Sequence, residues 1–233
     1  MESSRSGSVR ARVRAELTDE IKSTARRHLA TDGANLSLRA VARDLGMVSS
    51  AIYRYFASRD DLLTALIIDA YDSLGEAAEQ AYASVPSSDL DAGWMAICRA
   101  IRSWALANRP EYALTYGSPV PGYAAPQDTI GPASRPVLLL AELLREGVRR
   151  GQLDARSTIR MPAPLRADLR RVAALPGFDG VPEVIFVRGM TAWTQLFGVI
   201  SFELFGRLTN AIEDYDAYFD YQMRVMSAHL GFR

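Results

Sequence analysis

Cysteine and histidine are scarce in this chain of 233 residues, which contains one cysteine and two histidines. Cys98 has no second cysteine to pair with, so an intrachain disulfide is excluded and the cytoplasm is the expected compartment. His28 and His229 lie far apart in the sequence, and with Cys98 they offer too few ligands for a zinc site. We therefore expect neither a metal nor another cofactor.

Motifs of common enzymes are also missing. The sequence has no glycine-rich phosphate loop, no Gly-x-Ser-x-Gly element and no His-Glu-x-x-His element. Two pairs of adjacent acids, Asp60–Asp61 and Glu213–Asp214, stand where helices are expected to begin, and the helix dipole favours acids there. We interpret them as helix-start residues and do not expect an enzyme.

No apolar run is long enough to cross a bilayer. Residues 189–202 form an uncharged segment of fourteen residues between Arg188 and Glu203, whereas a membrane-spanning helix needs about 20. This segment is typical of a buried core or interface helix, so no membrane is expected as a partner. The N-terminus is polar and basic, without the apolar core of a secretory signal.

Net charge is zero over the whole chain but unevenly distributed along it. Residues 1–59 contain eleven Lys or Arg and six Asp or Glu, a net of +5, which leaves −5 for residues 60–233. Such asymmetry indicates a basic module joined to a body that is not basic, and a basic module suits DNA. We therefore expect a DNA-binding domain at residues 1–59 and a larger domain at 60–233.

The first residues of the chain combine arginine with Ser and Gly. We expect a disordered arm here, which could lie along phosphates or in a minor groove. The alternative is a solvated terminus with no defined role. The arginines concerned are Arg5, Arg10, Arg12 and Arg14.

Apolar residues recur at intervals of three and four along most of the chain, which predicts α-helices. No strand pattern is present, so we expect an all-α fold of about nine to ten helices. Three of them form the small N-terminal domain, and the others form the larger one. The expected helices cover about residues 9–31, 38–45, 49–55, 60–84, 88–107, 110–116, 131–150, 165–174, 183–208 and 214–230.

The segment from Ser37 to Leu63 contains two short helices joined by a glycine turn. Ser37 is a good N-cap, and Gly46 stands where the chain must turn. In the second short helix Ile52 and Phe56 are four residues apart and therefore share one buried face. Two helices joined in this way form a helix-turn-helix unit, whose second helix enters the DNA major groove.

The opposite face of that second helix carries Ser50, Tyr53 and Arg54. Hydroxyl groups bind phosphates or base edges, and arginine binds guanine with two hydrogen bonds. These three residues are therefore the candidates for contacts in the groove. Ser58 and Asp61 then form a capping box that opens a long helix.

Taken together, these residues resemble the N-terminal domain of the TetR/AcrR family of transcriptional regulators. The matching elements are Gly46, the aromatic-rich run Ile52–Phe56 and the run Ser58–Leu62, within a match that covers about residues 16–66. The chain departs from the family pattern at Val48, where the family usually has a capping serine. Either Ser49 caps the helix instead, or the helix begins less firmly.

The resemblance and the local chemistry together give a set of DNA-binding candidates. Besides the three groove residues, we expect phosphate contacts from residues at or near helix starts. A base contact from Ser49 depends on how the helix begins. The full set is Ser37, Arg39, Ser49, Ser50, Tyr53, Arg54, Tyr55 and Arg59.

Large apolar side chains recur every three or four residues in the penultimate helix, and the last helix has a similar spacing. By pattern alone, such a stripe indicates core packing more often than an interface. The resemblance favours an interface, because the family dimerises through its last two long helices. The expected dimer residues are Phe186, Met190, Trp193, Phe197, Ile200, Leu204, Tyr218, Gln222 and Val225.

Aromatic residues are frequent in the larger domain, where they could line a ligand cavity or simply fill the core. Members of the resembled family commonly bind a small, often lipophilic effector there and then release DNA. The candidates for ligand contact are Trp94, Trp104, Tyr112, Tyr116, Met190, Trp193 and Phe197.

These observations predict a homodimeric DNA-binding regulator. The resemblance implies a repressor that a small apolar or aromatic effector releases from double-stranded operator DNA, with the long helix that begins near Asp60 acting as a lever. The alternative is a helical small-molecule-binding or adaptor protein without operator binding.

Overall fold

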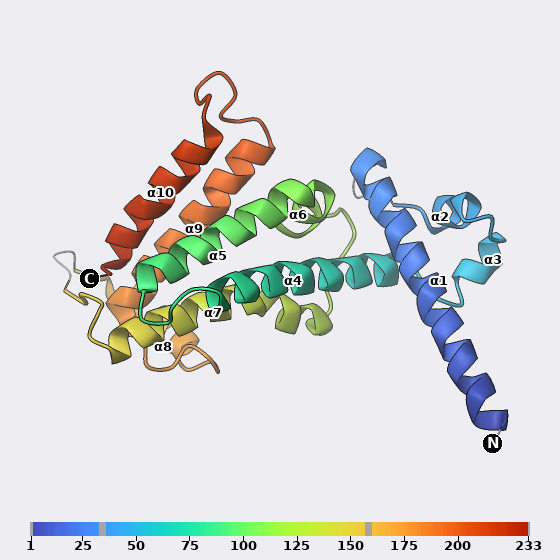
Figure 1. The fold of residues 1–233 in the computed structure, drawn as a ribbon, viewed down its shortest axis with the longest axis horizontal. Helices are drawn as coiled ribbons and strands as arrows, with labels where there is room; N and C mark the ends of the chain where they lie inside the picture. Colours follow the sequence, from blue (N-terminus) through green and yellow to red (C-terminus); the bar gives the residue numbers. More distant parts are fainter. Residues whose placement is uncertain (1, 33–35, 157–159, 233) are drawn as a thin grey trace. The chain divides into compact units, whose positions relative to one another are not determined.

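The computed structural model describes residues 2–32, 36–156 and 160–232. These residues form ten α-helices, one short 3₁₀ helix and one isolated bridge between Leu153 and Phe232 (Figure 1). The expected all-α fold is confirmed. The helices are α1 (Glu2–Asp32), α2 (Leu38–Asp44), α3 (Ser49–Ile52), α4 (Arg59–Ala83), α5 (Leu90–Ala107), α6 (Arg109–Tyr116), η1 (Gln127–Thr129), α7 (Ile130–Arg149), α8 (Ala163–Ala173), α9 (Glu183–Leu204) and α10 (Tyr215–Leu230).

Two helix ends differ from the sequence prediction. α1 begins at Glu2 and not near Val9, so the segment expected to be a disordered arm is helical, and that prediction is wrong. Once a helix exists, each further residue adds one hydrogen bond at little cost, which favours extension towards the N-terminus. α9 ends at Leu204, four residues early, because Gly206 adopts a left-handed conformation with φ of 70° and closes the helix.

The chain divides into two compact units that differ from the expected domains. Unit 1 comprises residues 1–71 and 108–130, and unit 2 comprises residues 72–107 and 131–233. The predicted boundary after residue 59 falls inside unit 1, because Leu62, Leu63 and Leu66 of α4 belong to the core of that unit. The remaining part of α4 belongs to unit 2, so one continuous helix contributes to both.

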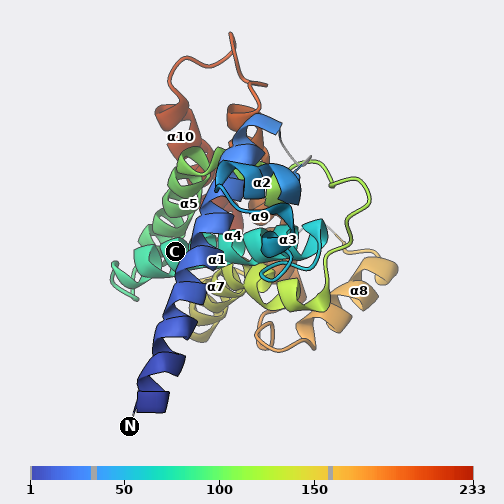
Figure 2. The same ribbon diagram turned by 90° about the vertical axis from the view of Figure 1, so that its right-hand side faces the viewer.

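Unit 1 is a small helical domain around a single apolar core. α1 contributes Ile21 and Ala25, and α2 contributes Val41; all three side chains are fully buried. α2 packs against both α1 and α3, an arrangement that is visible in Figure 2. The loop after α6 adds Val120 to the core, and the Tyr123 hydroxyl lies 2.9 Å from Thr64 Oγ1. Residues 108–130 therefore belong to unit 1 by packing, although they are distant in sequence.

Unit 2 is a helical bundle centred on α5. The Trp94 side chain is fully buried, and its indole N–H donates a hydrogen bond to the Met223 carbonyl of α10 at 2.8 Å. Trp104 is also buried and donates to Ser73 Oγ of α4 at 3.0 Å. Both indoles are therefore packed and hydrogen-bonded within the bundle, as buried tryptophans usually are.

α9 has an apolar surface that its own chain covers only in part. It is the one helix, within the described ranges, that is long and apolar enough to cross a membrane by length and composition. Core helices of soluble proteins meet the same criterion. Only 33% of its most apolar window is buried in unit 2, so the helix combines a core face with an exposed face.

A buried ion pair fastens α5 to α9. Arg102 donates from Nε and Nη2 to the two carboxylate oxygens of Glu203, both at 2.8 Å, and from Nη1 to Asp216 at 2.7 Å. The Arg102 and Glu203 side chains are 12% and 10% exposed, whereas Asp216 is 89% exposed. Of the two carboxylates that bind this guanidinium, Glu203 is the less exposed and accepts two hydrogen bonds, whereas Asp216 is exposed and accepts one.

This difference predicts unequal losses of stability. Glu203→Ala leaves the Arg102 charge without its buried partner, so the free energy of unfolding should fall by about 2–4 kcal/mol. Asp216→Ala removes a solvated partner and should cost less than about 0.5 kcal/mol. Denaturant unfolding followed by tryptophan fluorescence measures both values. Equal losses for the two variants would contradict this interpretation of the cluster.

Candidate functional site

The second helix of the helix-turn-helix unit is shorter than the sequence predicts. α3 covers only Ser49–Ile52, and the next turn is tighter, because Tyr55 N donates to the Ile52 carbonyl at 2.9 Å, three residues back. Val48 occupies the N-cap position and makes no side-chain cap hydrogen bond. Of the two alternatives for the missing serine, the structure therefore has the helix that begins without a side-chain cap.

Packing and the glycine turn hold this short helix in place. Ile52 is fully buried and Phe56 nearly so, and both belong to the core of unit 1. Gly46 has a φ of 65°, which is the left-handed conformation expected at the turn. Met47 N then donates to the Ala42 carbonyl at 2.8 Å and closes α2. The sequence predictions for Gly46, Ile52 and Phe56 are confirmed.

The outer face of α3 and the turn after it is polar and exposed. Ser49, Ser50 and Arg54 are exposed, and Tyr53 is 45% exposed. Arg39 is exposed on the neighbouring helix α2. The structure therefore brings these five DNA-binding candidates to the surface of one small domain.

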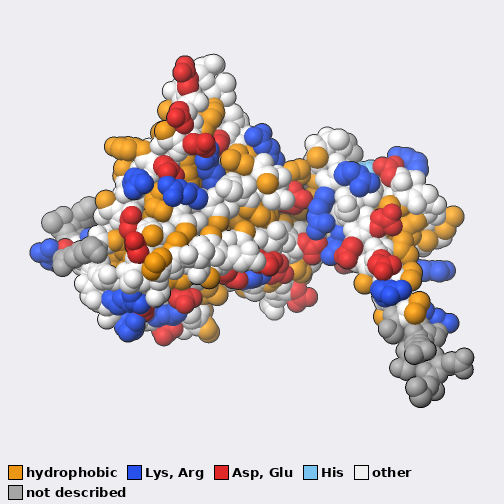
Figure 3. Space-filling view, in the orientation of Figure 1, with side chains coloured by type: hydrophobic (Ala, Val, Ile, Leu, Met, Phe, Trp, Pro, Cys, Tyr) orange, Lys and Arg blue, Asp and Glu red, His pale blue; other side chains and the backbone are white. Residues whose placement is uncertain are grey.

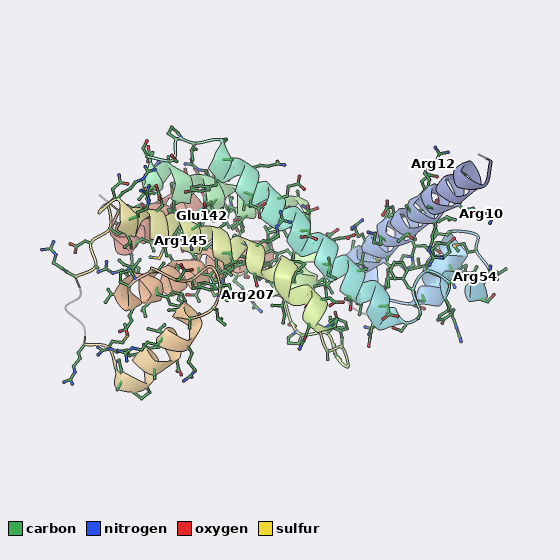
Figure 4. All side chains as sticks on the ribbon, turned by 90° about the horizontal axis from the view of Figure 1, so that it is seen from below. Arg10, Arg12, Arg54, Glu142, Arg145 and Arg207 are labelled. Atoms are coloured by element: carbon green, nitrogen blue, oxygen red, sulfur yellow. The ribbon has the colours of Figure 1, made fainter. Side chains whose placement is uncertain are left out.

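Basic side chains of unit 1 divide into two groups. Lys22 and Arg26 bind Asp69 at 2.9 and 2.6 Å, so they join α1 to α4 within the protein. Arg10 and Arg12 project from the N-terminal half of α1 and Arg54 from the turn after α3 (Figure 4). Figure 3 shows Lys and Arg side chains along α1 and over α2 and α3. The exposed group supplies a positively charged surface around α3.

Arg14 is a functional residue that sequence reasoning assigned only to the arm. Its Nη2 donates to the Arg54 carbonyl at 2.8 Å, and its guanidinium carbon lies 5.3 Å from the centre of the Tyr55 ring. A cation at the C-terminal end of a helix is favoured by the helix dipole. Arg14 thus fastens the end of the recognition element to α1. Forty residues separate the partners, so local spacing gives no signal for this contact.

Three of the predicted phosphate contacts already have roles within the protein. Ser37 Oγ accepts a hydrogen bond from Ala40 N at 3.4 Å, which confirms it as the N-cap of α2. Arg59 Nε donates to the Leu36 carbonyl at 3.2 Å, and this contact joins the start of α4 to the residue before that cap. Tyr55 is half-buried beneath Arg14. All three position the surface around α3.

Most of the predicted ligand-contacting aromatics lie in cores. Trp94 and Trp104 are the hydrogen-bonded indoles described above. Tyr112 and Tyr116 belong to α6 in unit 1, where their ring centres are 5.3 Å apart, and Tyr116 also contacts Tyr71 edge to face. Burial raises the pKa of the Tyr116 hydroxyl above its ordinary value. Trp94, Trp104 and Tyr112 are buried, Tyr116 is half-buried, and none of the four lines the pocket described next.

An apolar pocket of about 280 Å³ lies in unit 2 between α7, α8 and α9. Two of the ligand candidates, Met190 and Trp193, line it, and the Phe197 ring packs against Trp193 with ring centres 4.5 Å apart. Sequence reasoning missed the contributions of α7 and α8. The lining contains no ionisable side chain, and its residues are Val137, Leu140, Ala141, Leu144, Val172, Phe178, Val181, Phe186, Gly189, Met190, Trp193 and Thr194.

Each residue of an α-helix turns the chain by about 100° around the axis. On this scale the exposed face of α9 lies about 100° away from the predicted dimer stripe. Ile200 is fully buried, and Phe186 and Trp193 line the pocket, so these three predicted dimer residues do not lie on the exposed surface of the helix. In α10, Gln222 accepts a hydrogen bond from Gln195 of α9 at 3.2 Å. Among the exposed residues, the larger apolar and hydroxyl-bearing ones are here called the α9–α10 face: Met190, Thr191, Thr194, Phe202, Phe205, Tyr221 and Val225.

Comparison with known protein families gives two matches that together cover most of the chain. Residues 21–66 match the family of bacterial regulatory proteins called the tetR family. Residues 94–226 match the tetracyclin repressor-like C-terminal domain. The first match contains α2, α3 and the turn between them.

Individual proteins give the same result. An HTH-type transcriptional regulator of Mycobacterium tuberculosis and one of Mycobacterium bovis are each 38% identical over 222 residues, which is 94% of this chain and 94% of theirs. The crystal structure of the regulatory protein SCO4313 aligns with a TM-score of 0.77 at 31% identity, over 94% of this chain and 98% of that one. The regulator PfmR from Thermus thermophilus, with a TM-score of 0.57 and 20% identity, covers 88% of this chain and 97% of its own, and shares the fold.

The Arg14 contact predicts a local effect on the end of α3. Arg14→Met keeps the length of the side chain but removes the charged hydrogen bond to the Arg54 carbonyl. The amides of Arg54, Tyr55 and Phe56 should then exchange with solvent about tenfold faster or more, because a charge-assisted hydrogen bond contributes about 1.5–3 kcal/mol. Hydrogen exchange measured by NMR tests this. The matched control is Arg12→Met on the same helix, whose guanidinium pairs with Glu16 at 3.6 Å, and it should leave these amides unchanged. Equal exchange in both variants would show that Arg14 does not hold the recognition element.

Proposed function

Because the chain belongs to the TetR family of bacterial transcriptional regulators, we propose that it is a homodimeric repressor released from its operator by a small apolar effector. As a member of this family it is a DNA-binding transcriptional regulator. The observation that carries the proposal is the exposed polar surface of α3, supported from behind by the buried Ile52 and Phe56. A regulator acts where the chromosome is, so the proposed location is the cytoplasm.

In the proposed complex α3 lies in the major groove. Ser50, Tyr53 and Arg54 contact base edges, and Arg39 and Ser49 contact phosphates on either side. All five are exposed, so none has to leave a core to reach DNA. We propose two roles for Ser37, Tyr55 and Arg59. They help to fix the position of α3, and they also contact phosphates.

Dimerisation follows from the small size of the reading element. A helix of four residues contacts few base pairs, whereas two copies related by a two-fold axis read two half-sites about 34–36 Å apart. The α9–α10 face supports this proposal, because Phe202 and Tyr221 are 54% and 65% exposed. Large apolar side chains gathered on one surface mark an interaction site. Gly198 lies in the same stripe, and a Cβ there would meet nothing within 4 Å of its own chain, so a partner helix can approach closely.

The proposed effector binds the apolar pocket between α7, α8 and α9. A route from pocket to DNA-binding surface begins at α7, where Arg135 precedes the lining residue Val137. Arg135 binds Asp72 and Glu79 of α4 at 2.8 and 2.7 Å, and these hydrogen bonds lower the pKa of Glu79. Arg135 also packs closely on Gly75, where a Cβ would lie 2.9 Å from it. A shift of α7 is therefore passed to α4, whose first half carries core residues of unit 1.

In this proposal the dimer has two populations, one that binds the operator and one that does not, and the effector shifts the balance towards the second. The effector must bind these two states with different affinities, and by linkage the operator opposes effector binding to the same extent. Repression itself requires the operator to overlap a promoter. The adaptor alternative shares the pocket but lacks operator binding, so DNA binding separates the two.

Two arginine variants test the proposed docking. Arg54→Ala should lower affinity for the preferred duplex by about 1–3 kcal/mol and relax sequence preference, because it removes a base contact. Arg39→Ala should weaken binding to every duplex alike and reduce the salt slope by about one unit. Fluorescence anisotropy with a selected duplex and a scrambled one, at several salt concentrations, measures both effects.

Two results would count against the docking. If both variants bind both duplexes as the wild type does, α3 is not the reading element. If the wild type binds no duplex more tightly than a scrambled one, the adaptor alternative is favoured.

A further inference from the structure

The pocket of unit 2 opens on the exposed face of α9. Met190 and Thr194 line the pocket, and both are also exposed at the surface; half of the Met190 surface is accessible. Trp193, between them in the sequence, lines the wall and is half-buried. A molecule in this pocket therefore has one side that its own chain does not cover.

The mouth of the pocket lies on the surface proposed for dimerisation. Thr194, Gly198 and Phe202 are four residues apart and lie in one row along α9. Thr194 stands at the pocket end of this row and Phe202 at the other, so a partner helix that packs along the row also reaches the mouth. Met190 and Thr194 line the pocket and also belong to the α9–α10 face.

We propose that a second copy of this chain closes the pocket, so that each effector site is complete only in the dimer and effector binding strengthens the dimer. This inference rests on the proposed function. It adds that effector binding favours the dimer over the monomer. Release from the operator then proceeds within an intact dimer, not by its dissociation into monomers.

The lining also defines the class of effector. Of its residues only Thr194 carries a side-chain polar group that is not part of an aromatic ring, and none is ionisable. A charged ligand would lose its hydration without gaining a counter-charge, which is costly. The volume of about 280 Å³ lies near the lower end of ligand pockets, about 300–1,000 Å³. The site therefore suits a small, neutral, largely apolar molecule.

The size of the coupling follows from the area that the partner covers. If the partner removes about 50 Å² of apolar ligand surface from water, affinity rises about eightfold per site. A two-fold dimer has two such sites, so a saturating ligand should lower the dimer dissociation constant about sixtyfold. Linkage requires that each site of the dimer bind the ligand about eightfold more tightly than the monomer does.

A pair of fluorescent probes tests the proposal on the full chain. N-phenyl-naphthylamine is neutral and apolar, and anilinonaphthalene sulfonate has the same ring skeleton with a negative charge. Sedimentation equilibrium gives the dimer dissociation constant with and without each probe, and fluorescence titration gives the probe affinity. The neutral probe should bind and tighten the dimer, and the charged probe should do neither.

Two variants separate the pocket from the dimer face. Val137→Trp fills the pocket from α7, so it should abolish probe binding and leave the dimer constant unchanged in the absence of probe. Gly198→Glu places a charge in the row between Thr194 and Phe202, where an added Cβ meets nothing within 4 Å of its own chain, so the monomer should fold but not pair. Its affinity for the neutral probe should be about eightfold lower than that of the wild-type dimer.

Each other result overturns the inference in a distinguishable way. Equal probe affinity for Gly198→Glu and the wild-type dimer would mean that one chain alone completes the pocket. The inference would then be wrong, but the proposed effector site would be unaffected. A Gly198→Glu protein that still dimerises would place the interface elsewhere. Failure of the wild type to bind the neutral probe, or binding that survives Val137→Trp, would remove the effector site from this pocket and with it that part of the proposed function.

Discussion

The account depends on one constraint, which is that α3 is too short to hold its own shape. Four residues without a side-chain cap cannot form a stable helix in water. Its conformation is therefore imposed by the surrounding domain, through the burial of Ile52 and Phe56 and through the hydrogen bond from Arg14 to the Arg54 carbonyl in the turn that follows. The opposite face and the backbone fix the position of α3, so the side chains of its polar face are not needed to hold it in place.

In unit 2, the different sides of α9 likewise have different roles. One side of this helix is core, another lines the pocket and a third is exposed, so the proposed effector site and the proposed dimer surface share one element. α7 connects the pocket to α4 through Arg135, whose hydrogen bonds to Asp72 and Glu79 depend on the close approach at Gly75. This contact is the route by which the proposed effector acts on α4.

Local features of the fold were predictable, because capping, turn and periodicity depend on neighbours in the sequence. Ser37, Gly46 and the pair Ile52 and Phe56 are examples. Features fixed by distant contacts were not. Arg14 meets the end of α3 from forty residues away, and α9 is apolar on several sides, so periodicity could not tell which side is exposed. Trp94 and Trp104 were expected near a ligand, but only the packed bundle shows that their indoles are satisfied within the core.

The central claim is that paired copies of α3 read successive major grooves of a duplex. Hydroxyl-radical footprinting on the tightest duplex selected from a random pool tests it most directly. The account predicts two inverted half-sites protected on one side of the DNA, about 34–36 Å apart or at a multiple of that distance. A single protected half-site, or a pool that yields no sequence bound above background, would contradict it.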